Sequence, residues 1–151
     1  MTGLKHILVP TDFSANAELA LQYAKSLAGH YAAQIHLLHV IPDPTTAMGM
    51  YEQIGESIPE DWLESMLKHS DEQLEKIIKT GNISRNHFTG VTVQGDAFNA
   101  ISRYANDNDI DLIVIGMHGR THAIHHYLIG GLADRIVRKA PCPVLIVPAE
   151  N

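Results

Sequence analysis

Short apolar runs alternate along this chain with longer segments whose apolar residues recur at helical spacing. Continuous apolar runs are typical of strands that are buried on both faces of a parallel sheet. The order βαβαβαβαβ, without an internal repeat or a linker, predicts a single α/β domain over residues 1–151. Its expected architecture is a doubly wound five-stranded parallel sheet with helices on both faces. We expect the strands at residues 7–9, 34–41, 88–93, 112–115 and 144–147.

The helices are expected between these strands. Ser14 is the expected N-cap of the first helix, and the second helix is expected to begin near Pro59. Residues 42–58 hold several prolines and glycines, which predicts one long irregular segment there. The expected buried side of the second helix comprises Leu63, Met66, Leu67, Leu74, Ile77 and Ile78. The fourth helix is marked by Leu132, Ile136 and Val137.

Composition limits the class of the protein and its partners. Hydrophobic residues make up 45% of the 151 residues, which is enough for the core of one domain. The formal charge of −6 opposes binding to polyanions, so we predict neither a nucleic-acid nor a membrane partner. No segment approaches the ~18 apolar residues of a membrane span or shows the pattern of a signal peptide. With Cys142 as the only cysteine, we expect a cytoplasmic protein.

Doubly wound sheets bind ligands outside the carboxyl ends of their strands, so the residues that follow each strand carry the functional prediction. Pro10, Thr11 and Asp12 follow the first strand, and Val40 lies at the end of the second. The Asp12 carboxylate is suited to accept hydrogen bonds from ribose hydroxyls or an adenine amine, or to hold a metal; the alternative is a turn that caps the next helix. Thr11 is a turn residue in its simplest interpretation. Val40 offers either a wall for a base or ordinary core packing.

Glycines after the fourth strand predict a phosphate-binding loop. Glycine lets the backbone approach an anion closely, and free N–H groups at a helix N-terminus favour negative charge. The alternative is that these glycines only form turns. The spacing matches neither the P-loop nor the dinucleotide-binding motif. The residues concerned are Gly116, His118, Gly119, Arg120, Gly130 and Gly131.

Several separate blocks of this sequence resemble the universal stress protein (UspA-like) family, in order and spacing, over nearly the whole chain. They are residues 7–14, 39–41, 93–96, 111–121 and 138–148. The resemblance implies a sheet ordered 3-2-1-4-5. It also implies a homodimer in which the last strand, Val144–Val147, meets its counterpart across the two-fold axis.

The nucleotide-binding members of that family carry the pattern G-x2-G-x9-G-[ST]. The resemblance implies ATP, with Mg²⁺ or Mn²⁺, as the ligand, with Asp12 and Val40 at the ribose and adenine and the glycines along the phosphates. This chain departs from the pattern twice, because ten residues separate Gly119 from Gly130 and Gly131 replaces Ser or Thr. The missing hydroxyl removes a hydrogen bond worth ~0.5–3 kcal/mol, which weakens binding without necessarily abolishing it.

We therefore expect a stress-response protein that binds an adenine nucleotide and acts as a dimeric sensor or regulator. The sequence shows no convincing catalytic set, so at most weak ATP hydrolysis is expected, and Cys142 is interpreted as structural. The alternative is a dimeric interaction module that binds no nucleotide. Its docking patch would comprise Met48, Met50, Tyr51, Ile54 and Trp62, unless these residues only pack over the sheet edge.

The ten histidines are unusual in number, and four of them cluster near the expected phosphate loop. In a helix, His122 and His126 would have the i, i+4 spacing of a weak candidate zinc, copper or nickel pair, although we predict no metal site. Protonated histidines could instead donate to phosphate, or simply be solvated. We interpret His36 and His39 as structural. His6, His30, His69 and His87 are interpreted as surface residues.

Overall fold

The computed structural model describes residues 3–81, 84, 87–117 and 131–150, and its five strands form one parallel sheet in the order β3-β2-β1-β4-β5. This confirms the predicted doubly wound architecture. Each strand pairs with its neighbour in the parallel sense. The strands are β1 (His6–Thr11), β2 (Gln34–Ile41), β3 (Phe88–Gln94), β4 (Leu112–Gly116) and β5 (Val144–Val147).

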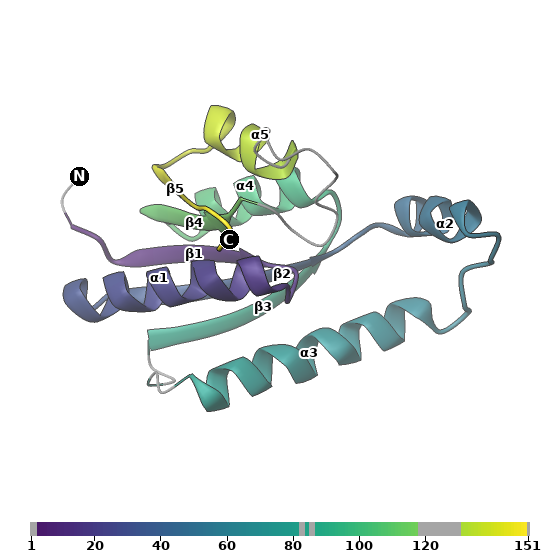
Figure 1. Ribbon diagram of the computed structural model, residues 1–151, viewed down its shortest axis with the longest axis horizontal. Coiled ribbons are helices and arrows are strands. Elements are labelled where there is room, and N and C mark those ends of the chain that lie inside the picture. The colour runs from purple at the N-terminus through teal and green to yellow at the C-terminus, as the bar shows by residue number, and fades with distance from the viewer. Residues whose placement is uncertain (1–2, 82–83, 85–86, 118–130, 151) are drawn as a thin grey trace.

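Helices cover both faces of the sheet. Figure 1 shows α1 (Ala15–Tyr31) and α3 (Trp62–Thr80) on one face, and α4 (Ala97–Asp107) and α5 (Gly131–Lys139) on the other. Because successive strand residues point to opposite faces, each strand supplies both cores. Val9 and Leu37 pack with α1 and α3, whereas Leu8 and Leu38 pack with α4 and α5.

Residues 42–58 contain a helix, so the prediction of one long irregular segment was wrong. In α2 (Pro44–Gln53), Asp43 caps the N-terminus by accepting a hydrogen bond from the Thr46 N–H at 2.9 Å. Proline is favoured in the first turn, where its missing N–H costs nothing, and one glycine within a helix is tolerated. In Figure 1, α2 projects away from the sheet, beside the first half of α3.

Two apolar residues that mark the predicted helices are exposed. Leu67, predicted to lie on the buried side of α3, is 40% exposed, and Val137 of α5 is 47% exposed. Figure 1 shows the first half of α3 extending past the ends of the strands, where apolar residues have less of the sheet to pack against. In α5 the buried residues are Ala133 and Ile136, so Val137 lies outside the buried stripe. No helix in the described ranges combines the length and the hydropathy needed to span a membrane.

Candidate functional site at the carboxyl edge of the sheet

The strand order reverses between β1 and β4, and these two strands part toward their carboxyl ends. Their register pairs Ile7 with Leu112 and Leu8 with Ile113, and both strands continue beyond these pairs. By contrast, β1 stays paired with β2 as far as Thr11, opposite His39. The sheet therefore opens at the reversal point, which is where doubly wound folds bind their ligands.

The loop after β1 places Asp12 at this opening. The Phe13 N–H donates to the Thr11 Oγ1 at 3.0 Å, and the Ser14 N–H donates to the Asp12 Oδ1 at 3.0 Å. Ser14 Oγ then accepts from the Ala17 N–H at 3.3 Å, which confirms Ser14 as the N-cap of α1. Thr11 serves the turn, as expected. Asp12 also serves it, because its Oδ1 accepts from the Ser14 N–H.

Gly116 ends β4 against the first turn of α1. A Cβ at this position would lie 2.8 Å from the Asn16 carbonyl oxygen, which is closer than real Cβ contacts. Only glycine lets the strand end come this near to the helix backbone. Gly116 thus has a structural role that the sequence did not indicate, beside any contact with phosphate.

The other predicted site residues divide into those that the structure describes and those outside the described ranges. Pro10 is buried in β1, and Val40 is half-buried and packs with the core under α4 and α5. Gly131 begins α5 and is exposed, with open space where a Cβ would stand. Four predicted phosphate-loop residues, His118, Gly119, Arg120 and Gly130, and the metal candidates His122 and His126, lie outside the described residues.

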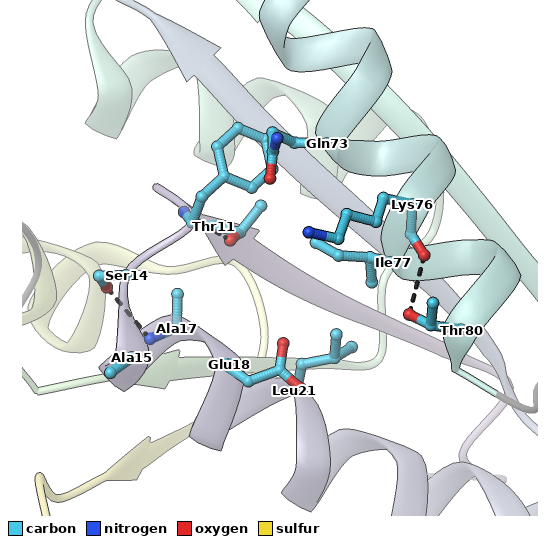
Figure 2. Close-up of a pocket in the computed structure, with 11 residues that line it drawn as sticks. Thr11, Ser14, Ala15, Ala17, Glu18, Leu21, Gln73, Lys76, Ile77 and Thr80 are labelled. Carbon is cyan, nitrogen blue, oxygen red and sulfur yellow. Dashed lines mark hydrogen bonds between the residues drawn. The ribbon is translucent and has the colours of Figure 1, made fainter.

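A groove of about 360 Å³ lies behind the same loop, between α1 and α3. Thr11 and Ser14 line one end, so the loop separates this groove from the opening between β1 and β4. Figure 2 shows Glu18 of α1 and Lys76 of α3 pointing into the space from opposite walls. The lining therefore combines opposite charges with apolar side chains such as Leu21 and Ile77.

The strand histidines are buried, which confirms their structural interpretation. His36 and His39 are 7% and 8% exposed. Burial, together with the neighbouring His6, lowers the pKa of His36. His36 Nδ1 lies 2.8 Å from the Tyr104 hydroxyl, and its Nε2 lies 3.1 Å from His6 Nδ1. The interpretation of His6 as a surface residue was therefore wrong, because it is half-buried in this cluster.

Cys142 lies away from the opening, before the start of β5. Burial raises the pKa of its thiol, and the Asp111 carboxylate raises it further. A thiol with a raised pKa stays protonated and is a poor nucleophile. Among the described residues, no group of three or more His, Cys, Asp or Glu is placed to hold a metal ion.

The expected docking patch divides in two. Trp62 is buried with Ala47 and Ile41 in a small third core, and Tyr51 packs against it. Met48, Met50 and Ile54 remain 47%, 52% and 69% exposed. Packing thus accounts for the aromatic residues, and the aliphatic ones are exposed on and just after α2.

Comparison with known proteins supports the assignment to a family. The model of the universal stress protein family matches residues 3–148. The chain belongs to this family. Curated relatives include Universal stress protein MJ0577 of Methanocaldococcus jannaschii, 27% identical with 97% of this chain and 96% of the relative covered. A putative universal stress protein of Staphylococcus epidermidis is 31% identical over all of this chain and 88% of its own length.

Solved structures of the family share the fold. The structure of MJ0577 superposes with a TM-score of 0.77 at 31% identity, covering 97% of both chains. A universal stress protein in complex with cAMP gives a TM-score of 0.63 at 19% identity, and one from Archaeoglobus fulgidus in complex with dAMP gives 0.60 at 18%. These last two matches show a shared fold.

Proposed function

We propose that this universal stress protein binds an adenine nucleotide, ATP with Mg²⁺ or Mn²⁺, at the carboxyl edge of its sheet. The observation that carries the proposal is the parting of β1 and β4 at the point where the strand order reverses, with Asp12 at the opening. Two structures of the same fold hold cAMP and dAMP, which are both adenine nucleotides. A dimeric sensor or regulator of a stress response is the role that fits a binding site without a catalytic set.

Each predicted residue has a role in this proposal. The Asp12 carboxylate accepts hydrogen bonds from the ribose hydroxyls, beside Thr11. Val40 forms the apolar wall against the base and presents its backbone, and Pro10, buried in β1, precedes the loop that carries Asp12. The phosphates are assigned to Gly116, His118, Gly119, Arg120, Gly130 and Gly131.

A metal ion would arrive with the nucleotide. Mg²⁺ keeps several waters and is commonly held by phosphates and one or two carboxylates. The described residues gather no cluster of three or more ligands, and Asp12 is the one carboxylate assigned to the site, which fits this mode. The ion would neutralise phosphate charge in an acidic protein.

The homodimer is part of the proposal and concerns the edge strand β5. β5 pairs with β4 and is the last strand of the sheet order, yet its sequence is entirely apolar. Leu145 is 36% exposed there. An apolar edge strand invites pairing with another copy. Analytical ultracentrifugation of Leu145→Lys should give a monomer if β5 forms the interface, and an unchanged dimer would place the interface elsewhere.

The exposed aliphatic residues near α2 favour a second candidate, a module that binds a protein partner. Met48 and Met50 are about half exposed and Ile54 more so. Methionine-rich surfaces adapt to varied partners. Two results together would favour this candidate. The wild type would bind no nucleotide, and the double variant Met48→Ser/Met50→Ser would lose a protein partner that the wild type binds.

Isothermal titration of ATP with Mg²⁺ into the wild type and Asp12→Asn tests the proposed nucleotide site. Asparagine keeps an Oδ1 acceptor for the Ser14 N–H, so the turn is retained, but it replaces a carboxylate oxygen with a donor. We expect affinity to fall by roughly tenfold to a hundredfold, because a hydrogen bond to a charged group is worth ~1.5–3 kcal/mol.

Asp107→Asn is the matched control. Asp107 is exposed at the far end of α4, so this variant should bind as the wild type does. The absence of heat and of a thermal shift at millimolar ATP in the wild type would contradict the proposed function. Equal affinity of Asp12→Asn and wild type would remove Asp12 from the site.

A further inference from the structure

Phe13 holds an uncommon backbone conformation in the loop that carries Asp12. Its φ of 65° lies in the left-handed region, which is disfavoured for bulky side chains. Residues keep such conformations where the surrounding structure fixes them. The hydrogen bonds from Phe13 N–H to Thr11 and from Ser14 N–H to Asp12 hold the backbone on either side. The position of the ring has a separate cause.

The ring of Phe13 packs on the face of the sheet that α1 and α3 cover. Its centroid lies 4.5 Å from that of His39 in β2, with the ring planes at 46°. A second imidazole, that of the exposed His69 in α3, lies edge-on at 6.1 Å and 88°. Both separations fall in the range of attractive aromatic pairs. The ring is thus held by two elements that lie outside its own loop.

His39 is in turn oriented by buried hydroxyl groups. Its Nδ1 lies 2.8 Å from the Oγ of Ser70 in α3, and that oxygen lies 2.6 Å from the Oγ1 of Thr92 in β3. Ser70 is fully buried. A continuous series of contacts therefore runs from β3 through α3 and β2 to the ring of Phe13.

We infer that Phe13, seated on His39, is a positioning residue for Asp12 in nucleotide binding. This inference rests on the proposed function, since it is Asp12 that would meet the ribose. The left-handed turn at Phe13 follows Asp12 directly and directs the chain into α1. Fixing the ring thus fixes the backbone from which the carboxylate projects. A group held in place before its ligand arrives binds more tightly than one that must be ordered on binding.

The groove between α1 and α3 shows why the contact with His39 matters. Phe13 lines this space of about 360 Å³, so part of its surroundings is open rather than close-packed. Figure 2 shows Lys76 of α3 extending into the groove, which Gln73 of the same helix also lines. Of the two imidazoles beside the ring, His39 is buried and its centroid is the nearer, so we assign the anchoring to His39.

The test compares Phe13→Gly with Phe13→Tyr. Glycine adopts a φ of 65° without strain, so Phe13→Gly removes the ring and retains the turn. Titration with ATP and Mg²⁺ should show affinity about tenfold weaker for Phe13→Gly, a loss of about 1.4 kcal/mol. Phe13→Tyr keeps the ring and should bind within about twofold of the wild type, a difference well below that figure.

A second measurement, without nucleotide, separates this inference from the proposed function. The Ser14 N–H is bonded to Asp12 Oδ1, so its hydrogen-exchange protection reports whether the loop is fixed. We expect Phe13→Gly to lose protection at Ser14 while Ala24, buried in α1, keeps it. Unchanged protection at Ser14 would overturn the inference, as would equal nucleotide affinity of the wild type and Phe13→Gly. If the wild type binds no nucleotide, the proposed function fails, and Ser14 protection still decides whether the ring positions the loop.

Discussion

Replacing Gly116 with alanine tests whether the close contact between the end of β4 and the first turn of α1 requires a glycine. The added Cβ would lie 2.8 Å from the Asn16 carbonyl oxygen and 3.1 Å from the carbonyl carbon. Ordinary contact begins near 3.4 Å, so β4 or the first turn of α1 must retreat by roughly 0.6 Å. The neighbour is backbone, which cannot rotate away as a flexible side chain can.

The expected cost follows from comparable overpacking. Insertions into well-packed sites destabilise proteins by about 1–3 kcal/mol. At about 2–4 °C per kcal/mol for a chain of this size, the midpoint of thermal unfolding should fall by roughly 2–12 °C. Urea denaturation should give the same loss in free energy of unfolding without a large change in the m-value.

Gly29→Ala provides the control for this substitution. Gly29 lies exposed in α1, and a Cβ there meets nothing within 4 Å. Alanine should stabilise the helix by about 0.5–1 kcal/mol. A Gly116→Ala variant that unfolds at or above the wild-type midpoint would refute the close contact between β4 and α1.

Further predictions concern pH, thiol reactivity, affinity and capping. Because the pKa of His36 is lowered in the folded state, the unfolded chain binds more protons than the folded protein does. The free energy of unfolding should therefore decrease as pH falls below about 6.5. His36→Gln should flatten this dependence in urea titrations at pH 5 to 8. The raised pKa of Cys142 predicts slower iodoacetamide labelling in the native protein than in the unfolded chain at pH 7.5, and equal rates would contradict it. Gly131→Ser restores the hydroxyl of the family pattern in open space, and should tighten ATP binding by about tenfold in the same titration. Ser14→Ala removes the cap of α1 and should lower the free energy of unfolding by about 1 kcal/mol, whereas no loss would show that the cap is dispensable.

The sheet was predictable because its strands carry continuous apolar runs. In the runs around Leu8 and Ile113, successive residues are apolar, so both faces of each strand are buried. The alternation of strands and helices then requires parallel pairing. The order of the strands was implied by the family resemblance and is confirmed by the observed order.

The helix α2 was missed because its signals are ambiguous in a single sequence. A proline in the interior of a helix disrupts it, whereas a proline in the first turn is favoured, so Pro44 alone predicts neither outcome. Asp43 indicates either a turn or a cap. What decides between them is burial of Ala47 against Ile41 and Trp62, a contact between distant segments that local patterns do not encode.

The sequence predicted which residues follow the strands at the carboxyl edge, but not the contacts that support them. Asp12 and Val40 were placed correctly at the carboxyl edge because strand ends are readable from the sequence. The approach of Asn16 to Gly116 joins residues one hundred positions apart, and no spacing indicates it. The left-handed conformation of Phe13 is equally hidden, because phenylalanine has no preference for it.

An amide chemical-shift map with ATP and Mg²⁺ tests nucleotide binding at the carboxyl edge of the sheet. Binding there predicts saturable shifts at Thr11, Asp12 and Val40, around the opening between β1 and β4. It predicts none at His6 and Asp111, which lie at the amino ends of the same two strands. No shifts at millimolar nucleotide, or shifts confined to the amino ends, would contradict nucleotide binding at this edge.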